Sequence, residues 1–165
     1  MIYISHRGNI NGKNPERENS PDYILEAIDK GYEVEVDLWL LKDKWYFGHN
    51  EPTYDVGDLG EYLKYFNKIW FHCKNLEAFG TLLVSKNFIV SGSEHNYSLD
   101  NNEKFFWHQN DDFTLTSTNK IWTYPGKELC DFSIAVLPET VNYADDELKN
   151  CYGICSDFIE KYKYS

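Results

Sequence analysis

An apolar segment that carries carboxylates at alternate positions is the feature that most limits what this chain can fold into. Residues 33–40 read Glu-Val-Glu-Val-Asp-Leu-Trp-Leu. Alternation along a β-strand places Glu35 and Asp37 on the same face of a sheet. Inward-facing carboxylates are expensive to bury without a partner, and a metal ion with an anionic substrate would stabilise them.

The first half of the chain alternates between predicted strands and helices. Ser20 suits a helix N-cap, Pro21 suits the first turn, and Gly31 suits the end of that helix. The predicted elements are strand 2–5, helix 20–31, strand 33–40, extended segment 45–47, helix 59–66, strand 69–73 and a helix capped by Asn75. This order predicts a parallel sheet.

The second half has a different pattern, with short apolar runs separated by loops that are too short or too polar for full helices. The predicted strands are 88–91, 105–108, 113–116, 121–124, 133–137 and 153–156. A helix is expected only over 144–150, with a terminal turn from Asp157. The outer helices of a regular α/β fold are therefore expected to be missing here.

Length and charge limit the classes of function. The chain has 165 residues, which predicts a single domain over 1–165 with a sizeable core. Its net charge of −11 argues against binding to nucleic acid or to an anionic membrane surface, although a local basic pocket for one phosphate is allowed.

The cysteines and the N-terminus indicate a compartment. The four cysteines do not form a metal-binding C-x-x-C pattern and are expected to be reduced thiols. The first residues lack the basic and apolar regions of a signal peptide, and no run approaches the roughly 18 apolar residues of a membrane span. The protein is therefore expected to be cytoplasmic.

Several short motifs, in one order and at similar spacing, resemble the signature of the glycerophosphodiester phosphodiesterase family. The N-terminal pieces are His6-Arg7-Gly8, Glu18-Asn19-Ser20, Glu35-Val36-Asp37, Lys42-Asp43 and His49. The later pieces are Phe71-His72-Cys73-Lys74, Ile121-Trp122-Thr123 and Gly153-Ile154-Cys155-Ser156-Asp157. Each motif alone is weak, but together they touch nearly the whole chain.

The resemblance implies a (β/α) barrel with its site at the carboxyl ends of the strands, as in other barrel enzymes. It implies catalytic roles for His6 and His49, phosphate binding by Arg7, metal binding by Glu35 and Asp37, and a site role for Lys74 on the third strand.

The sequence departs from the family pattern in ways that change the expected fold. His72 stands where the family has a third acidic ligand, and Arg17 and Asn50 replace other motif residues. A full barrel usually needs about 200 to 250 residues. We therefore predict an α/β fold of the reduced, irregular (β/α) TIM-type barrel, with helices missing in the second half. Exposed strand flanks would then favour a homodimer.

The expected cofactor is a divalent metal ion held by Glu35, Asp37, His72 and Glu18. Carboxylate oxygens favour Mg²⁺ or Ca²⁺, whereas the imidazole of His72 leaves Mn²⁺ or Zn²⁺ open. The alternatives are a solvated edge strand for the carboxylates, a substrate-contacting or core role for His72, and for Glu18 a loop carboxylate that holds Arg7.

The remaining site residues are assigned to proton transfer and substrate binding. Imidazole titrates near neutrality, so His6 and His49 are predicted to form a general acid–base pair rather than structural histidines. Arg7 and Lys74 would bind the phosphate, whether or not they also pair with the carboxylates. Trp122 would line the pocket or pack in the core, and residues 108–111 are read as a polar loop.

The predicted function is hydrolysis of a small soluble glycerophosphodiester, or of a related sugar or alcohol phosphodiester, by a metal-dependent phosphodiesterase. Two alternatives remain open. One is a phosphodiester lyase that stops at a cyclic phosphate, and the other is a barrel that binds a phosphorylated ligand without turning it over.

Overall fold

The computed structural model describes residues 1–87, 103–108 and 111–164. The predicted strand over 88–91 and the loop residues Gln109 and Asn110 lie outside them. The strands are β1 (Ile2–His6), β2 (Glu33–Leu41), β3 (Lys44–Phe47), β4 (Tyr54–Gly57), β5 (Ile69–Cys73), β6 (Lys104–Phe106), β7 (Phe113–Leu115), β8 (Ile121–Thr123), β9 (Ser133–Val136) and β10 (Gly153–Ser156).

Helices connect only some of these strands. The α-helices are α1 (Pro21–Asp29), α2 (Leu76–Asn87), α3 (Asp145–Asn150) and α4 (Ile159–Lys163), and η1 (Leu59–Tyr65) and η2 (Pro138–Thr140) are 3₁₀ helices. The expected positions of β1, α1, β2, β5 and α2 are confirmed. The segment expected as a helix over 59–66 is the 3₁₀ helix η1, in which Leu59 and Tyr62 share the buried side at the three-residue spacing of that helix.

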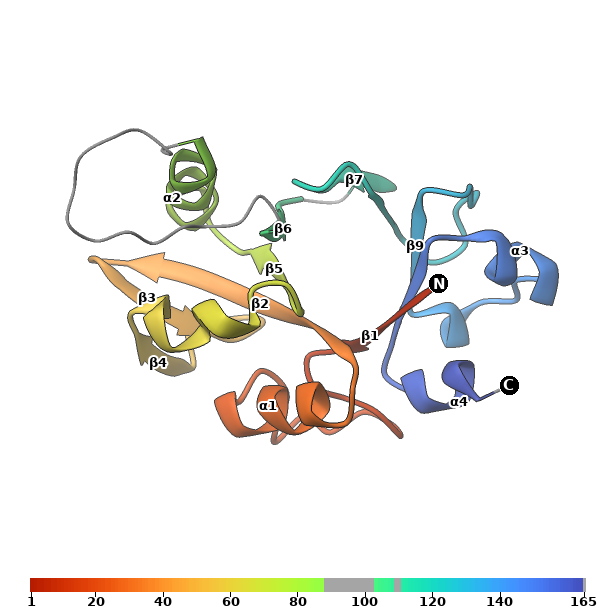
Figure 1. The fold of residues 1–165 in the computed structure, drawn as a ribbon, viewed down its shortest axis with the longest axis horizontal. Helices are drawn as coiled ribbons and strands as arrows, with labels where there is room; N and C mark the ends of the chain where they lie inside the picture. Colours follow the sequence, from red (N-terminus) through yellow and green to blue (C-terminus); the bar gives the residue numbers. More distant parts are fainter. Residues whose placement is uncertain (88–102, 109–110, 165) are drawn as a thin grey trace.

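The strands form one mixed sheet. Parallel pairs join β6, β5, β2, β1, β10, β9 and β8 in that spatial order. At one end β7 runs antiparallel to β8, and an antiparallel hairpin of β3 and β4 continues from the second half of β2. Figure 1 shows the sheet curling, with the helices on its outside.

The expectation of a TIM-type (β/α) barrel is wrong. In the described residues the sheet forms a curled half-barrel with four short helices, rather than a barrel of alternating strands and helices. The physical reason lies in the connections, because a helical crossover between parallel strands needs a dozen or more residues. Residues 116–120 instead close a hairpin between β7 and β8, and residues 124–132 join β8 to β9 without a helix.

The two faces of the sheet have different cores. The outer face packs against α1, α2 and α4 through residues such as Val34, Val36, Ile69 and Ile154. The inner, concave face holds a smaller cluster of buried side chains: Ile4, Trp70, Phe106, Trp122, Ile134, Val136 and Cys155. Because side chains alternate along each strand, the concave face is also where Glu35 and Asp37 lie.

No α-helix in the described part of the chain is long and apolar enough to cross a membrane. This finding agrees with the absence of a long apolar run in the sequence.

Candidate functional site

The site residues meet at the carboxyl ends of the parallel strands, on the concave face. In the register of β1 with β2, His6 lies beside Glu35, and in the register of β2 with β5, Asp37 lies beside His72. Parallel pairing therefore brings side chains from three separate strands to one place. All four side chains are almost completely buried.

Glu35, Asp37 and His72 form a group that could hold a metal ion. Each offers one ligand atom, and these atoms lie within 4.8 Å of one another. His72 Nδ1 is 3.1 Å from Asp37 Oδ1 and 3.5 Å from Glu35 Oε1. Glu35 Oε2 is buried and accepts no hydrogen bond from any described residue. An acceptor left free in a buried site is what a bound cation would satisfy, so the donor set fits a metal.

Asp37 is surrounded by cationic and hydrogen-bond-donating groups. Its Oδ2 lies 2.9 Å from Arg7 Nε and 3.1 Å from His49 Nδ1, and its Oδ1 lies 3.4 Å from Lys74 Nζ. Burial alone would raise the pKa of Asp37, but hydrogen bonds with His49 and His72 and the charge of Arg7 outweigh it. The net effect holds the pKa of Asp37 well below its ordinary value, so the group is a carboxylate.

The carboxylates of Asp37 and Glu35 change the pKa of His72. Burial lowers the pKa of His72, whereas its hydrogen bonds to Asp37 and Glu35 raise it, and the net shift is upward.

The imidazole ring of His72 is stacked on Phe106 at a centroid distance of 4.9 Å and meets the ring of His108 edge-on at 4.5 Å. Ring contacts therefore fix the direction in which His72 points.

His6 is held on the opposite side by the carboxylate of Asp157, which directly follows the last strand. His6 Nδ1 is 2.7 Å from Asp157 Oδ1, and His6 Nε2 is 3.9 Å from Glu35 Oε2. Burial raises the pKa of Asp157, but the hydrogen bond and charge of His6 outweigh it and lower the value. An imidazole bonded through one nitrogen to a carboxylate presents its other nitrogen in a fixed orientation, here toward the metal group.

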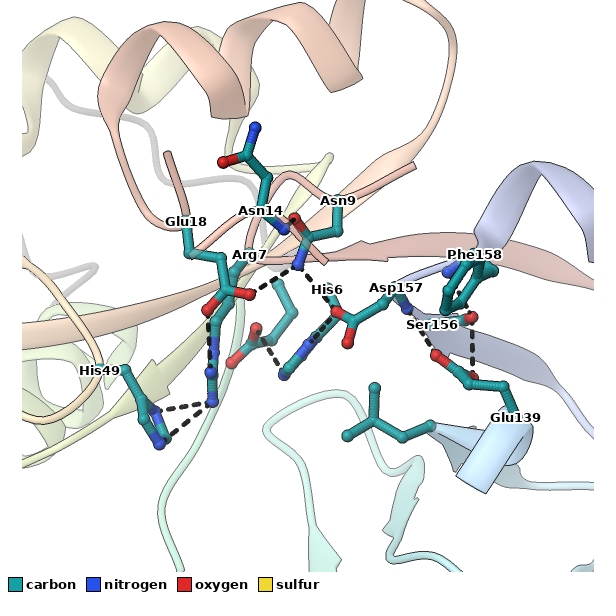
Figure 2. A network of polar contacts seen from close by, with 12 residues as sticks. His6, Arg7, Asn9, Asn14, Glu18, His49, Glu139, Ser156, Asp157 and Phe158 are labelled. Atoms are coloured by element: carbon teal, nitrogen blue, oxygen red, sulfur yellow. Dashed lines mark hydrogen bonds and ion pairs between the residues drawn. The ribbon is translucent and has the colours of Figure 1, made fainter. Parts of the chain in front are cut away.

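Asn9 joins the two sides of this network, as Figure 2 shows. Its Nδ2 donates to Asp157 Oδ1 at 2.8 Å and to Glu18 Oε1 at 3.0 Å. Its Oδ1 accepts the backbone N–H of Asn14 at 3.0 Å. Asn9 is fully buried, so one amide anchors the loop between β1 and α1 and positions two carboxylates.

Glu18 lies next to Arg7 rather than in the metal group. Arg7 Nη1 donates to Glu18 Oε2 at 3.3 Å, while Arg7 Nη2 is 2.7 Å from His49 Nδ1. Figure 2 shows Arg7 between Glu18 and His49. Arg7 stays protonated. Burial lowers its pKa, but the charges of Asp37, Glu35 and Glu18 outweigh this effect and raise it.

The backbone around Arg7 adopts conformations that are uncommon for side chains larger than glycine. Arg7 has φ 55° and Asn19 has φ 62°. The two segments are tied by a hydrogen bond from the Asn19 N–H to the Arg7 carbonyl, and the Asn19 side chain donates to Asp37 Oδ2 at 2.9 Å. Strained backbone that the surroundings hold in place is common at functional sites.

A cluster of aromatic side chains packs next to these polar groups. Trp122 is 2% exposed and stacks on Phe106 at 4.4 Å, and it lies 6.0 Å from Trp70. His108 stacks on Tyr124 at 4.3 Å. Burial beside the cations His72 and Lys74 lowers the pKa of His108 to about 4, so this imidazole is neutral at physiological pH.

The structure brings most of the predicted site residues together. His6, Arg7, His49 and Lys74 all lie within ion-pair distance of Glu35 or Asp37, and Glu18 lies within ion-pair distance of Arg7. Trp122 lies in the concave core, where packing accounts for its position. Glu33 lies on the same face of β2 as Glu35. Its Oε2 accepts hydrogen bonds from Lys104 Nζ and from Trp70 Nε1, each at 2.6 Å.

Sequence reasoning missed roles for Asp157, Asn9 and Asn19. Asp157 directly follows the last strand, at the carboxyl end where the resemblance to a barrel places the site, and that position would have selected it. Asn9 and Asn19 flank the loop that follows β1, and no spacing rule links either residue to its partners.

Comparison of this chain with protein-family models, with curated proteins and with solved structures found no match.

Proposed function

We propose that this chain is a divalent-metal-dependent phosphodiesterase that hydrolyses a small soluble glycerophosphodiester or a related sugar or alcohol phosphodiester. The observation that supports it is the buried Glu35, Asp37 and His72 group with cations and two histidines at its edges. The resemblance of the sequence motifs to glycerophosphodiester phosphodiesterases supports the same reaction class.

Phosphodiester cleavage needs charge stabilisation and two proton transfers. A divalent ion held by Glu35, Asp37 and His72 would supply Lewis-acid polarisation of a phosphoryl oxygen. Arg7 and Lys74 would bind the phosphate oxygens and offset the negative charge that develops on them.

The two histidines divide the proton transfers in this proposal. One of His6 and His49 accepts a proton from the attacking water as its oxygen bonds to phosphorus, and the other donates a proton to the departing alkoxide as the second P–O bond breaks, which leaves a phosphomonoester and an alcohol. Asp157 fixes the orientation of His6, and His49, whose side chain is 40% exposed, stands at the solvent side of the site.

Phosphorus NMR on the purified protein tests the proposal, with a panel of glycerophosphodiesters and each of Mg²⁺, Ca²⁺, Mn²⁺ and Zn²⁺, with and without chelator. A phosphomonoester signal that chelator abolishes is the expected result. His6→Ala should lower turnover by on the order of 10² or more while the fold is kept. A cyclic phosphate that persists would instead indicate a lyase, and no turnover with any metal would contradict the enzyme.

A further inference from the structure

His72 supplies a nitrogen donor at a position that faces both carboxylates of the group. Its Nδ1 lies 3.1 Å from Asp37 Oδ1 and 3.5 Å from Glu35 Oε1, and β5 holds it directly beside Asp37 in the parallel register. The side chain is buried, and its ring is packed against Phe106 and His108. An ion bound between the two carboxylates would therefore meet an imidazole nitrogen whose orientation is already fixed.

Oxygen donors for a hard cation are scarce at this place. In the described part of the chain the group contains two carboxylates and one imidazole. The neighbouring carboxylates have other partners, because Glu18 is bound by Arg7 and Asn9, and Asp157 is bound by His6 and Asn9. Ca²⁺ takes six to eight oxygen ligands and Mg²⁺ takes an octahedron of oxygens.

A mixed set of imidazole and carboxylate donors suits first-row transition ions better than it suits Mg²⁺ or Ca²⁺. We propose that His72 is the residue that determines metal specificity in this site, and that it selects a transition ion of the Mn²⁺ to Zn²⁺ series over Mg²⁺ and Ca²⁺. The inference rests on the proposed function for the assignment of this group as the metal centre, and it adds the class of the ion.

Tight binding of Zn²⁺ alone would not test the role of His72, because most protein sites bind Zn²⁺ more tightly than Mn²⁺. Mn²⁺ is the weakest binder of the first-row series and also accepts oxygen ligands. The ratio of the Mg²⁺ to the Mn²⁺ dissociation constant is therefore a sensitive measure of the nitrogen donor. The same ratio measured in His72→Glu and His72→Gln separates the loss of nitrogen from the gain of a carboxylate.

Isothermal titration calorimetry of the chelator-treated protein with MnCl₂, MgCl₂ and CaCl₂, without substrate, gives these constants. We expect the wild-type protein to prefer Mn²⁺, and His72→Gln to lose about tenfold or more in Mn²⁺ affinity. His72→Glu should bind Mg²⁺ and Ca²⁺ more tightly than the wild-type protein does. The ratio of the Mg²⁺ to the Mn²⁺ dissociation constant should therefore fall by about tenfold or more. An unchanged ratio in His72→Glu would overturn the proposal, as would a wild-type protein that binds Mg²⁺ as tightly as Mn²⁺.

Pulsed EPR of bound Mn²⁺ provides a second measurement that does not depend on the folding of every variant. A nitrogen coupling is expected in the wild-type protein and should be absent in His72→Glu. If both variants fail to fold by circular dichroism, the wild-type spectrum and titration decide alone, and the absence of a nitrogen coupling would overturn the proposal.

The two proposals fail in different ways. A protein that prefers Mn²⁺ through His72 but cleaves no phosphodiester would contradict the proposed function and leave the metal assignment standing. A phosphodiesterase that binds Mg²⁺ or Ca²⁺ preferentially would contradict the role of His72 and leave the function standing.

Discussion

Glu35 is buried with one of its two carboxylate oxygens left without a hydrogen bond from the described residues. Its side chain is 1% exposed, and Oε2 accepts no hydrogen bond from the described residues. A buried charge with an incomplete set of partners lowers the stability of the metal-free chain. Residues that serve a site often carry such a cost.

We therefore predict that Glu35→Gln does not lower the melting temperature of the metal-free protein, because it replaces a buried charged side chain with a neutral one of similar shape. The same change should abolish stabilisation by metal. At a metal concentration of 100 times the dissociation constant, the wild-type protein gains about 2.7 kcal/mol. Thermal melts with and without MnCl₂ measure both effects. A variant that still melts at a higher temperature with MnCl₂ would refute the role of Glu35 as a ligand.

Asp157 gives a prediction for pH. The pKa of Asp157 is lowered in the folded chain because His6 outweighs the effect of burial. A lowered carboxyl pKa stabilises the fold above the unfolded value of about 3.9, and this stabilisation is lost as the pH falls toward the folded pKa. Asp157→Asn should thus lower the free energy of unfolding by about 1.5–3 kcal/mol at pH 6.

Denaturant melts of wild type and Asp157→Asn between pH 3 and pH 7 check this. The difference between the two proteins should shrink below about pH 4, where the carboxyl of the unfolded chain becomes protonated while that of the folded chain, with its lowered pKa, stays charged. A difference that stays constant over this range would show that the Asp157 charge contributes nothing.

At the scale of elements, the turn that follows β1 sets the geometry of the site. Gly8 has φ 93°, and a Cβ at this position would lie 2.6 Å from Cδ1 of Tyr23 in α1. The turn therefore requires a residue that tolerates a positive φ and has no side chain. It places Arg7 at Asp37 and leads into the loop that Asn9 and Glu18 hold.

Gly8→Ala is predicted to destabilise the fold by about 1–3 kcal/mol, since it combines a strained φ with a clash against α1. Gly57→Ala is a matched control, because Gly57 also has a positive φ, of 64°, but has open space around its Cα. Chemical denaturation of the two variants should show the larger loss for Gly8→Ala. Equal losses would show that the contact with Tyr23 is relieved without cost.

At the scale of the whole molecule, apolar side chains are exposed around β7. Leu115 is 69% exposed, Phe113 on the same strand is 47% exposed, and Phe132 in the loop before β9 is 57% exposed. Side chains two residues apart on a strand share one face, so Phe113 and Leu115 lie together. The homodimer expected from the sequence stays a prediction, and this surface is where a second copy would bind.

Sedimentation velocity over a range of protein concentrations tests the dimer. Leu115→Lys should shift the distribution toward the monomer, because it places a charge in the apolar contact. A wild-type protein that remains monomeric at all concentrations would contradict the dimer, and a dimer that Leu115→Lys does not weaken would place the interface elsewhere.

The sequence by itself determined where most strands and helices lie and which side chains share a face. Alternation in residues 33–40 was sufficient to predict that Glu35 and Asp37 point the same way, because that period is a local property of a strand. The site roles of His6, His72 and Lys74 were expected instead from the resemblance of the motifs to the glycerophosphodiester phosphodiesterase family.

Only the tertiary structure decided how these elements are assembled. The curled half-barrel, the pairing of β1 with β10 and the bond of Asp157 to His6 depend on pairing between segments far apart in the chain. Such pairing is set by competition among many possible long-range contacts. Local periodicity carries no information about that competition, which is why the barrel expectation failed although the shared face of Glu35 and Asp37 was found.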